Sequence, residues 1–389
     1  MRFLIKTFLC CITLLVSCKD KALLAPYFKQ ITSDIKKEYA PDKRVAIFNI
    51  LITKKKKIVI LSGETNLPEA YKKLTDSLTT LKFSFLDKIR ILPDSAIGEN
   101  AYAIARNSVI NIRSTPKHAA ELGTQGLLGM PLKVLDKKGD FYRVQTTDNY
   151  ISWVDKGGIV RMNKTDFDNY NTSKKIIFTK NFGYVYRDES FTATVSDITL
   201  GATLKLIEEK EKCYNVQFPD KRMGVVKKQE AQLYEIWLQN LHPSPANITH
   251  VAKQMLGFPY LWGGTSAKGL DCSGFTKMVY LMNGFVIPRD ASQQINAGKV
   301  VNKSLDFSEL QSGDLLFFGK KATIDKKQKV VHVGIWLGND KMEFIHSSGN
   351  VHISSMDRLQ NNYDSINKNR YLGSRRYLNN KDKNIIKLD

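Results

Sequence analysis

One cysteine of this 389-residue chain stands where a nucleophile would be expected. Cys272 precedes apolar residues that recur at the spacing of a buried helix, at Phe275, Met278, Val279 and Met282. The N-terminus of a helix has free N–H groups and the positive end of the helix dipole, and both favour a thiolate. We therefore expect the thiol of Cys272 to have a pKa below the ordinary value of about 8.5 and to act as a nucleophile.

Two histidines follow on predicted strands and could supply the base. Residues 329–337 alternate in polarity as a strand that contains His332, and residues 342–347 form a second strand that contains His346. A polar turn between them predicts a hairpin, which would place His346 near His332, where it could orient the ring. Nucleophile, base and orienting group together make a catalytic triad. His352 lies on the same face of an extended second strand, so spacing alone does not separate it from His346.

The same residues allow other interpretations. Cys272 could be an inert core cysteine, or it could bind zinc together with His332 and His346, because three N/S ligands and a water make a catalytic zinc site. The sequence has no C-x-x-C or H-E-x-x-H spacing to support zinc. A disulfide between Cys213 and Cys272 would be possible in an oxidising compartment, but the residues around Cys272 argue against it.

Six motifs in the last third of the chain, taken in order, resemble the NlpC/P60 family of papain-like cysteine peptidases. They are Y-x-W-G-G, D-C-S-G-F, P-R-D, S-G-D-L-L-F-F, H-V-G-I-W and F-I-H. The resemblance implies Cys272 as nucleophile, His332 as base and His346 as third member. It also implies cleavage of cell-wall peptides, typically between γ-linked D-glutamate and a diamino acid, with no metal or organic cofactor.

Earlier segments resemble smaller modules. Residues 101–162 contain short strands with N-x-R-x-x-P, L-L-G, F-Y-x-V and S-W-V, which resemble a bacterial SH3-like (SH3b) barrel, and residues 176–236 repeat this rhythm more faintly. Residues 22–93 predict a small α/β unit with a hairpin and a helix that begins near Leu67. The predicted divisions are a signal peptide at 1–17, an α/β domain at 18–95, SH3b modules at 96–165 and 166–240, and a peptidase domain at 247–378.

This combination resembles the γ-D-glutamyl-L-diamino acid endopeptidases, in which an SH3b module caps one end of the cleft. The cap leaves room only for a free N-terminal L-alanine. The resemblance implies that the pocket is lined by Tyr260, Trp262, Asp271, Ser273 and Asp290. For the acidic residue and the tyrosine that bind the substrate amine, the best matches are Glu121 and Tyr150. Asp271 and Asp290 could also pair with the ammonium. Ala291 stands where some members have serine, which removes one hydrogen bond.

The N-terminus predicts export. A basic start is followed by the apolar segment 7–16, which is too short to span a bilayer. Residues 15–18, Leu-Val-Ser-Cys, resemble a bacterial lipobox, which implies cleavage before Cys18 and lipidation of its thiol. An ordinary signal peptide with a chance cysteine is the alternative. We expect an exported lipoprotein, held on a membrane of the cell envelope and facing the periplasm.

The charge balance bears on the partners. The chain has 59 lysines and arginines against 38 aspartates and glutamates, a net charge of +21, which favours anionic material. The lysines are scattered instead of forming a basic stripe, so we expect no nucleic-acid partner. The expected partners are peptidoglycan stem peptides, L-Ala-γ-D-Glu-diamino acid, and a membrane through the lipid, with the protein a monomer.

The expected fold class is α+β: a papain-like catalytic domain preceded by two small SH3-like β-barrels and a small N-terminal α/β domain. We also expect a linker at 241–246, a helix capped by Asn247 and a loose tail at 379–389. The leading function is a membrane-anchored cysteine endopeptidase of peptidoglycan fragments. Two alternatives remain open at this point: a non-catalytic wall-binding lipoprotein, and an amidase or acyl transferase that acts on another exported substrate.

Overall fold

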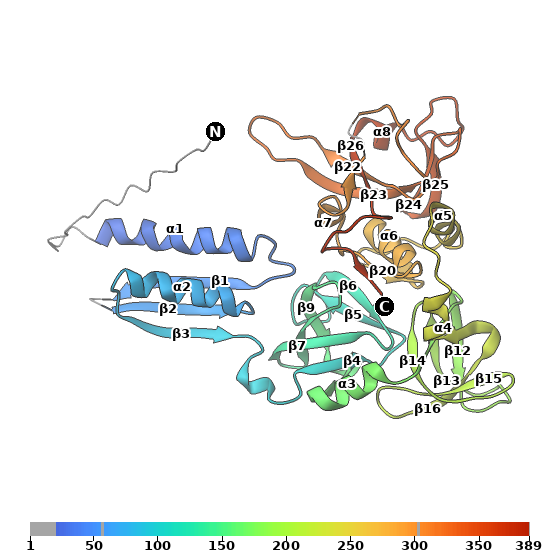
Figure 1. Cartoon of the computed structure of the whole chain (residues 1–389), viewed down its shortest axis with the longest axis horizontal. Helices are drawn as coiled ribbons and strands as arrows, with labels where there is room; N and C mark the ends of the chain where they lie inside the picture. The colour runs from blue at the N-terminus through green and yellow to red at the C-terminus, as the bar shows by residue number, and fades with distance from the viewer. Residues whose placement is uncertain (1–20, 56–57, 302–303, 389) are drawn as a thin grey trace. The chain divides into compact units, whose positions relative to one another are not determined.

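The computed structural model describes residues 21–55, 58–301 and 304–388 (Figure 1). The chain divides into two compact units, Met1–Leu92 and Pro93–Asp389. The predicted signal segment and the predicted lipidation site, Cys18, lie outside the described residues. Among the helices of the described part, none has the length and apolar character needed to cross a membrane.

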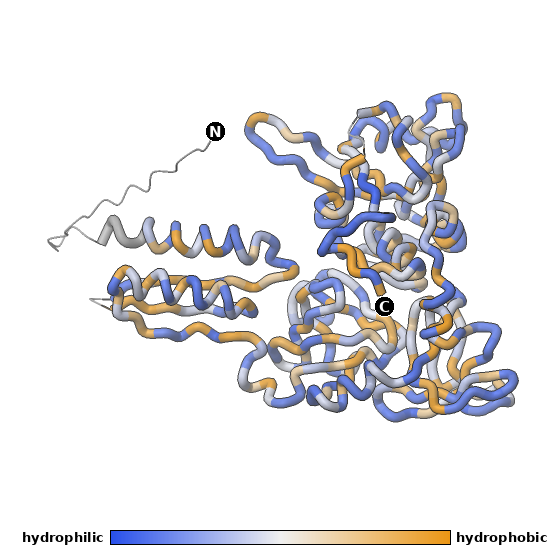
Figure 2. The backbone as a smooth tube through the Cα atoms, viewed as in Figure 1, coloured by the Kyte–Doolittle hydropathy of each residue, from blue (hydrophilic) through white to orange (hydrophobic). Residues whose placement is uncertain are grey.

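The first unit packs two helices against a three-stranded sheet. Its elements are α1 (Lys21–Tyr39), β1 (Phe48–Lys55), β2 (Ile58–Thr65), α2 (Pro68–Thr80) and β3 (Phe85–Ile91). β1 and β2 form an antiparallel hairpin, and β3 pairs parallel to β2 after α2. Ala70, Leu74 and Leu78 are buried on one face of α2, as helical spacing requires. The predicted hairpin and helix are confirmed, whereas α1 and β3 were not predicted. Figure 2 shows that the strands of this unit are largely hydrophobic.

The first β module is a seven-stranded antiparallel sheet in the order β10-β4-β7-β8-β9-β5-β6. Its strands surround a buried aliphatic core that includes Ile112, Val134, Val144 and Val154. Its elements are η1 (Ser95–Ile97), β4 (Tyr102–Ala105), β5 (Val109–Arg113), β6 (Leu122–Leu127), β7 (Pro131–Lys138), β8 (Phe141–Gln145), β9 (Ile151–Asp155), η2 (Lys156–Gly158) and β10 (Ile159–Met162).

The fainter repeat forms a second β module, also with seven strands, in the order β13-β12-β16-β15-β14-β11-β17. Phe178, Leu204, Val216 and Val226 lie in its separate core. Its elements are α3 (Lys164–Thr172), β11 (Lys175–Phe178), β12 (Phe182–Tyr186), β13 (Thr194–Thr199), β14 (Thr203–Glu209), β15 (Cys213–Gln217), β16 (Met223–Lys227), η3 (Lys228–Glu230), β17 (Ala231–Leu233) and α4 (Tyr234–Gln239).

The C-terminal domain packs helix α6 against a six-stranded antiparallel sheet in the order β21-β26-β22-β23-β24-β25. The predicted apolar stripe of α6 is buried, and the predicted hairpin is formed by β23 and β24. The elements are α5 (Pro245–Lys253), β18 (Thr265–Ser266), β19 (Gly269–Leu270), α6 (Cys272–Leu281), β20 (Phe285–Val286), α7 (Ala291–Gln294), β21 (Lys299–Val300), β22 (Leu315–Lys320), β23 (Lys329–Trp336), β24 (Glu343–Ser348), β25 (Asn350–Ser355), α8 (Ser365–Asn369), β26 (Tyr371–Arg376) and β27 (Ile386–Lys387).

Two local predictions were wrong. The cap of α5 is Ser244, whose side chain accepts a hydrogen bond from the N–H of Asn247, with Pro245 at the first helical position. The C-terminal tail is not loose, because β27 pairs with β20 and the N–H of Leu388 donates to the carbonyl of Gly284 at 2.8 Å. Its apolar side chains pack against the domain core, which the high lysine and asparagine content concealed.

The first β module is joined to the catalytic domain by buried hydrogen bonds. Gln125 and Thr265 exchange three of them, at 2.9 to 3.1 Å, and Ser266 donates to the amide oxygen of Gln125 at 2.9 Å. The two backbones approach so closely that a Cβ at Gly263 would lie 2.2 Å from the carbonyl oxygen of Leu122. Gly263 also has φ of +79°, so a glycine is required there for both reasons.

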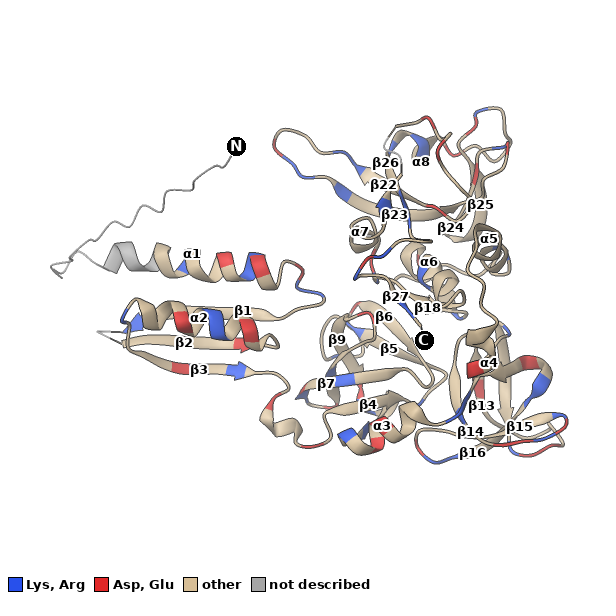
Figure 3. Cartoon of the chain, in the orientation of Figure 1, with Lys and Arg blue, Asp and Glu red and all other residues tan. Residues whose placement is uncertain are grey.

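A buried ion pair strengthens the same interface. Nζ of Lys277 on α6 lies 2.8 Å from Oδ2 of Asp148 in the β8–β9 turn, and the two side chains are 10% and 4% exposed. Burial alone would raise the pKa of Asp148, but Lys277 outweighs it and holds that pKa below its usual range. Figure 3 shows how few charged residues otherwise lie along α6.

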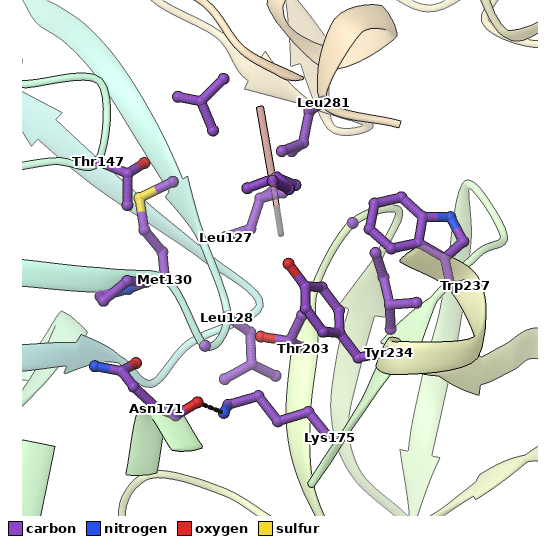
Figure 4. A pocket seen from close by; sticks show the side chains of 16 residues that line it. Leu127, Leu128, Met130, Thr147, Asn171, Lys175, Thr203, Tyr234, Trp237 and Leu281 are labelled. Carbon is purple, nitrogen blue, oxygen red and sulfur yellow. Dashed lines mark hydrogen bonds between the residues drawn. The ribbon is translucent and has the colours of Figure 1, made fainter. Parts of the chain in front are cut away.

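A cavity of about 230 Å³ lies where the two β modules meet the catalytic domain (Figure 4). Its lining is mainly apolar and includes Leu127, Trp237 and Leu281, one from each of the three parts. None of the residues that the sequence predicts to act on substrate line this cavity. The candidate site therefore lies outside this cavity.

Candidate active site

Cys272 is the first residue of α6, as predicted. Asp271 caps this helix, and its side chain accepts a hydrogen bond from the N–H of Gly274 at 2.7 Å. Cys272 is buried, with 8% of the residue exposed, and its thiol receives backbone hydrogen bonds from Val333 and Ser273. Since Val333 follows His332 on β23, the sulfur lies against the strand that carries the predicted base.

The two predicted histidines are in direct contact. Nε2 of His332 lies 2.8 Å from Nδ1 of His346, across the neighbouring strands β23 and β24. This contact uses Nε2 of His332, so Nδ1 is the nitrogen that remains available to a thiol. His352 packs on His346 with ring centroids 4.4 Å apart, but its own Nδ1 contacts the carbonyl of Asn350. The geometry thus separates His346 from His352, which spacing alone did not.

Ser354 on β25 extends this hydrogen-bonded chain, and no motif in the sequence distinguishes it from other serines. Its Oγ lies 3.1 Å from Nε2 of His346, and its side chain is buried. Two sets of proton positions satisfy the chain, but only one leaves Nδ1 of His332 unprotonated. In that set His332 donates through Nε2 to His346, and His346 donates through Nε2 to Ser354. A basic His332 therefore requires Ser354 to accept a hydrogen bond.

Burial sets the ionisation of the site. It raises the pKa of Cys272 to about 12, and the neighbouring carboxylate of Asp271 acts in the same direction. Burial also lowers the pKa of His332 to about 3 and that of His346 to about 2. The prediction of a lowered thiol pKa was wrong, because loss of solvation outweighs the hydrogen bonds from the helix terminus. The resting pair is a neutral thiol and a neutral imidazole.

Asp271 is held by a buried arginine. Arg289, which is 1% exposed, donates to its two oxygens at 2.6 and 3.1 Å, and also to Oγ of Ser273 at 3.0 Å. The N–H of Gly263 donates to the same carboxylate at 3.0 Å. The charge of Asp271 is thus already neutralised within the protein, and its pairing with a substrate ammonium stays a prediction. Asp271 and Ser273 position the start of α6, and Arg289 is a site residue that sequence reasoning missed.

The other predicted pocket residues lie in three different environments. Burial, together with the nearby Cys272 and Asp271, raises the pKa of Tyr260 to about 12. The phenol of Tyr260 therefore lies near the thiol. Trp262 is 63% exposed and donates through Nε1 to Oε1 of Glu121 at 2.8 Å. Asp290 begins α7 in a capping box with Gln293, so its carboxylate has a structural role.

The first β module forms one wall of this site. Glu121 precedes β6 and reaches Trp262, as described above. Tyr150 precedes β9, and its phenol contributes to the electrostatic environment of Arg289. A Cβ at Gly123 would lie 3.2 Å from the Tyr150 hydroxyl, which locates that hydroxyl beside the start of β6. The structure therefore brings both predicted residues of this module to the catalytic domain.

The remaining alternatives can be compared with this geometry. Cys213 and Cys272 are both free thiols, in separate domains, so they form no disulfide. Among the described residues no group of three or more histidine, cysteine, aspartate or glutamate side chains is placed to hold a metal. What the arrangement can do is nucleophilic acyl transfer: a buried thiol, a base whose free nitrogen is set by a hydrogen-bonded chain, and helix N–H groups beside them.

Known proteins share this arrangement. The sequence profile of the NlpC/P60 family matches residues 257–385, and that of the bacterial dipeptidyl-peptidase Sh3 domain matches residues 112–159. The gamma-D-glutamyl-L-lysine dipeptidyl-peptidase of Bacillus cereus is 31% identical over 277 residues, which are 67% of this chain and 77% of the relative. Dipeptidyl-peptidase 6 of Lysinibacillus sphaericus is 27% identical over 66% of this chain and 92% of its own length.

A solved structure agrees with the sequence matches. The crystal structure of an NlpC/P60 family protein from Bacillus cereus has a TM-score of 0.61 and 25% identity, and it covers 71% of this chain and 99% of its own. Because a relative above 30% identity is matched over most of its length, and the site and fold agree with it, this chain belongs to the NlpC/P60 family of cysteine peptidases.

Proposed function

We propose that this cysteine peptidase hydrolyses the bond between γ-D-glutamate and the diamino acid in peptidoglycan stem peptides that have a free N-terminal L-alanine. The observation that carries the proposal is the Trp262–Glu121 hydrogen bond. This contact joins a carboxylate of the first β module to Trp262, a residue of the segment that precedes Cys272. The names of the Bacillus relatives, both gamma-D-glutamyl-L-lysine dipeptidyl-peptidases, support the same substrate class.

In the proposed mechanism, Sγ of Cys272 attacks the γ-carbonyl carbon of D-glutamate while Nδ1 of His332 takes the thiol proton. The backbone N–H of Cys272 and the hydroxyl of Tyr260 are the proposed donors to the oxyanion. The tetrahedral intermediate collapses as His332 gives the proton to the leaving amine of the diamino acid. Water then attacks the thioester, with His332 again as base, and releases L-Ala-D-Glu and the thiol.

The neutral resting pair suits this sequence of steps. Because burial keeps His332 unprotonated at neutral pH, it can accept the thiol proton directly. The charges of thiolate and imidazolium then appear together, side by side, only as the carbonyl is attacked. The chain through His346 to Ser354 supports the imidazolium by holding its Nε2–H in a hydrogen bond.

Recognition of the free amino terminus is assigned to the first β module. An ammonium next to Glu121 gains a charge-assisted hydrogen bond, and the exposed ring of Trp262 offers an aromatic face to a cation. An acylated amino terminus, as in intact sacculi, would leave the carboxylate unpaired.

We further propose that the chain is an exported lipoprotein, anchored through Cys18 and facing the periplasm. The support is the sequence of residues 1–18, a basic start, an apolar segment and Leu-Val-Ser-Cys. Cys18→Ser should move the protein from the membrane fraction to the soluble fraction of cells that express it, and should abolish incorporation of a labelled fatty acid. Fatty-acid labelling that survives in Cys18→Ser would contradict the anchor.

Replacement of the nucleophile tests the enzyme. Cys272→Ala should lower the turnover of L-Ala-γ-D-Glu-diaminopimelate by at least about 10³-fold, because no other group is proposed to attack the carbonyl. Mass spectrometry of the released L-Ala-D-Glu measures this, and circular dichroism checks the fold. Cys213→Ala is the matched control and should keep full turnover. Comparable turnover by wild type and Cys272→Ala would refute the mechanism.

Loss of the Ser354 hydroxyl tests the hydrogen-bonded chain. In Ser354→Ala the Nε2–H of His346 loses its acceptor, which favours the tautomers in which Nδ1 of His332 is protonated and cannot act as a base. We expect kcat to fall about tenfold with little change in KM, from the cost of about 1–3 kcal/mol for an unsatisfied buried donor. The rate of alkylation of Cys272 should fall in parallel. Ser354→Thr keeps the hydroxyl and should keep the rate; a rise in KM alone would assign Ser354 to substrate binding.

Neutralisation of Glu121 tests recognition of the amino terminus. Glu121→Gln keeps an oxygen to accept from Trp262 but removes the charge, so kcat/KM for the free tripeptide should fall about tenfold, within the range of charge-assisted hydrogen bonds. The N-acetylated tripeptide should be cut poorly and equally by both proteins. Glu99→Gln, an exposed glutamate before β4, serves as control. If acetylated and free peptides are cleaved at the same rate by wild type, the proposed preference is wrong.

A further inference from the structure

The hairpin between β22 and β23 projects from the catalytic domain and is strongly basic (Figure 3). We call residues 320–329 the basic hairpin. The strands pair up to Lys320 and Lys329, and the turn is closed by mutual backbone hydrogen bonds between Thr323 and Lys326 at 2.9 and 3.4 Å. All ten residues are exposed, and they carry a net charge of +4, with one acidic residue, Asp325, and five lysines, namely Lys320, Lys321, Lys326, Lys327 and Lys329.

These lysines differ from many others on the surface. Elsewhere, lysines are matched by nearby carboxylates, as in the pairs Lys156–Asp140 and Lys210–Glu189. Within the described residues, none of the five lysines of the basic hairpin forms an ion pair. Their charge is therefore available to an external anion.

The tip of the hairpin is apolar. Ile324 lies inside the closed turn between Thr323 and Lys326 and is completely exposed, at 101% of its reference area. A β-branched aliphatic side chain at this position makes no contribution to the core. Val331, where the hairpin joins β23, is also 44% exposed. The projection thus combines an aliphatic tip with flanking ammonium groups.

This combination favours one class of anionic partner. A soluble or wall-bound polyanion would bind through the lysines alone, and the side chain of Ile324 would stay exposed to water. At the surface of a bilayer that contains anionic lipids, an apolar side chain can enter the headgroup–acyl boundary while the lysines contact the phosphates. We propose that the basic hairpin docks on an anionic lipid surface with Ile324 inserted.

Such docking would orient the active site. His332 pairs with Phe318 across β22 and β23, with ring centroids 5.7 Å apart, so the base and the basic hairpin share the same two strands. A hairpin held at the bilayer would keep the pocket near the membrane surface. Docking of the basic hairpin requires neither lipidation at Cys18 nor the proposed substrate, so a chain without the lipid can test it.

The experiment uses the chain from residue 19 to 389, which keeps every described residue and lacks the lipidation site. Binding is measured by flotation with phosphatidylcholine vesicles that contain or lack phosphatidylglycerol. We expect salt-sensitive binding only to the anionic vesicles. Replacement of three hairpin lysines by glutamine should weaken it by about tenfold or more, since each lysine near such a surface contributes substantially. The variant is Lys321→Gln, Lys326→Gln and Lys327→Gln.

Two further variants decide between charge and insertion. Ile324→Ser should weaken vesicle binding severalfold with no change in net charge. A control of equal charge changes three exposed lysines of β7, Lys133→Gln, Lys137→Gln and Lys138→Gln, and should bind as wild type does. All variants should cleave the tripeptide at the wild-type rate, which checks folding and keeps this result separate from the proposed activity.

Three outcomes would overturn the proposal. If the β7 control variant loses as much vesicle binding as the hairpin variant, the binding depends on net charge in general. Loss with the hairpin lysines but not with Ile324→Ser would mean electrostatic contact without insertion. Binding to purified sacculi that depends on the hairpin lysines, with vesicle binding unaffected, would assign the basic hairpin to a wall polymer instead.

Discussion

The carboxylate of Asp271 joins the three segments that make the site. It caps α6 through the N–H of Gly274, accepts from Gly263 in the turn after Tyr260, and forms a two-point ion pair with Arg289. Burial of such a pair is costly unless nearly every polar atom of the carboxylate is satisfied. Here five donor groups reach the two oxygens, including the hydroxyl of Ser273, so the first turn of α6 and Cys272 are held in one position. The other features of the site build on that position.

The same burial that fixes the thiol also removes its charge. A solvated cysteine at a helix terminus would gain from the helix dipole. In this site the sulfur is enclosed beside β23, and the imidazoles of His332 and His346 are also withdrawn from water. Neutral forms are favoured at every member, and catalysis depends on proton transfer within the group. Proton transfer from the thiol requires an unprotonated Nδ1 on His332. The hydrogen bonds that orient the two imidazoles, including the one to the Ser354 hydroxyl, determine this.

The pocket is shared between domains. The side chains of Gln125 and Thr265 exchange hydrogen bonds with each other's backbone, and the backbones of Leu122 and Gly263 lie close together. Lys277 and Asp148 form a buried ion pair. Buried and fully paired polar contacts make an interface rigid. The two β modules and the catalytic domain accordingly form one compact unit, Pro93–Asp389. This buried interface holds the first β module against the catalytic domain, so Glu121 is kept within hydrogen-bond distance of Trp262 although that contact is itself exposed.

Local pattern alone was enough to predict many elements. The helical stripe after Cys272, the β23–β24 hairpin and the α2 helix follow from periodicities of 3.6 and 2 residues, which are properties of short segments. The same patterns predicted Cys272, His332 and His346 as the catalytic residues. The pocket residues were implied by the motif resemblance. The tertiary structure alone decided which histidine pairs with His332, that Asp271 is neutralised by Arg289, that Ser354 completes the chain, and that the thiol is neutral. These depend on burial and on contacts between residues far apart in the sequence, because solvation and hydrogen-bond partners are set by what packs around a group and not by its neighbours along the chain.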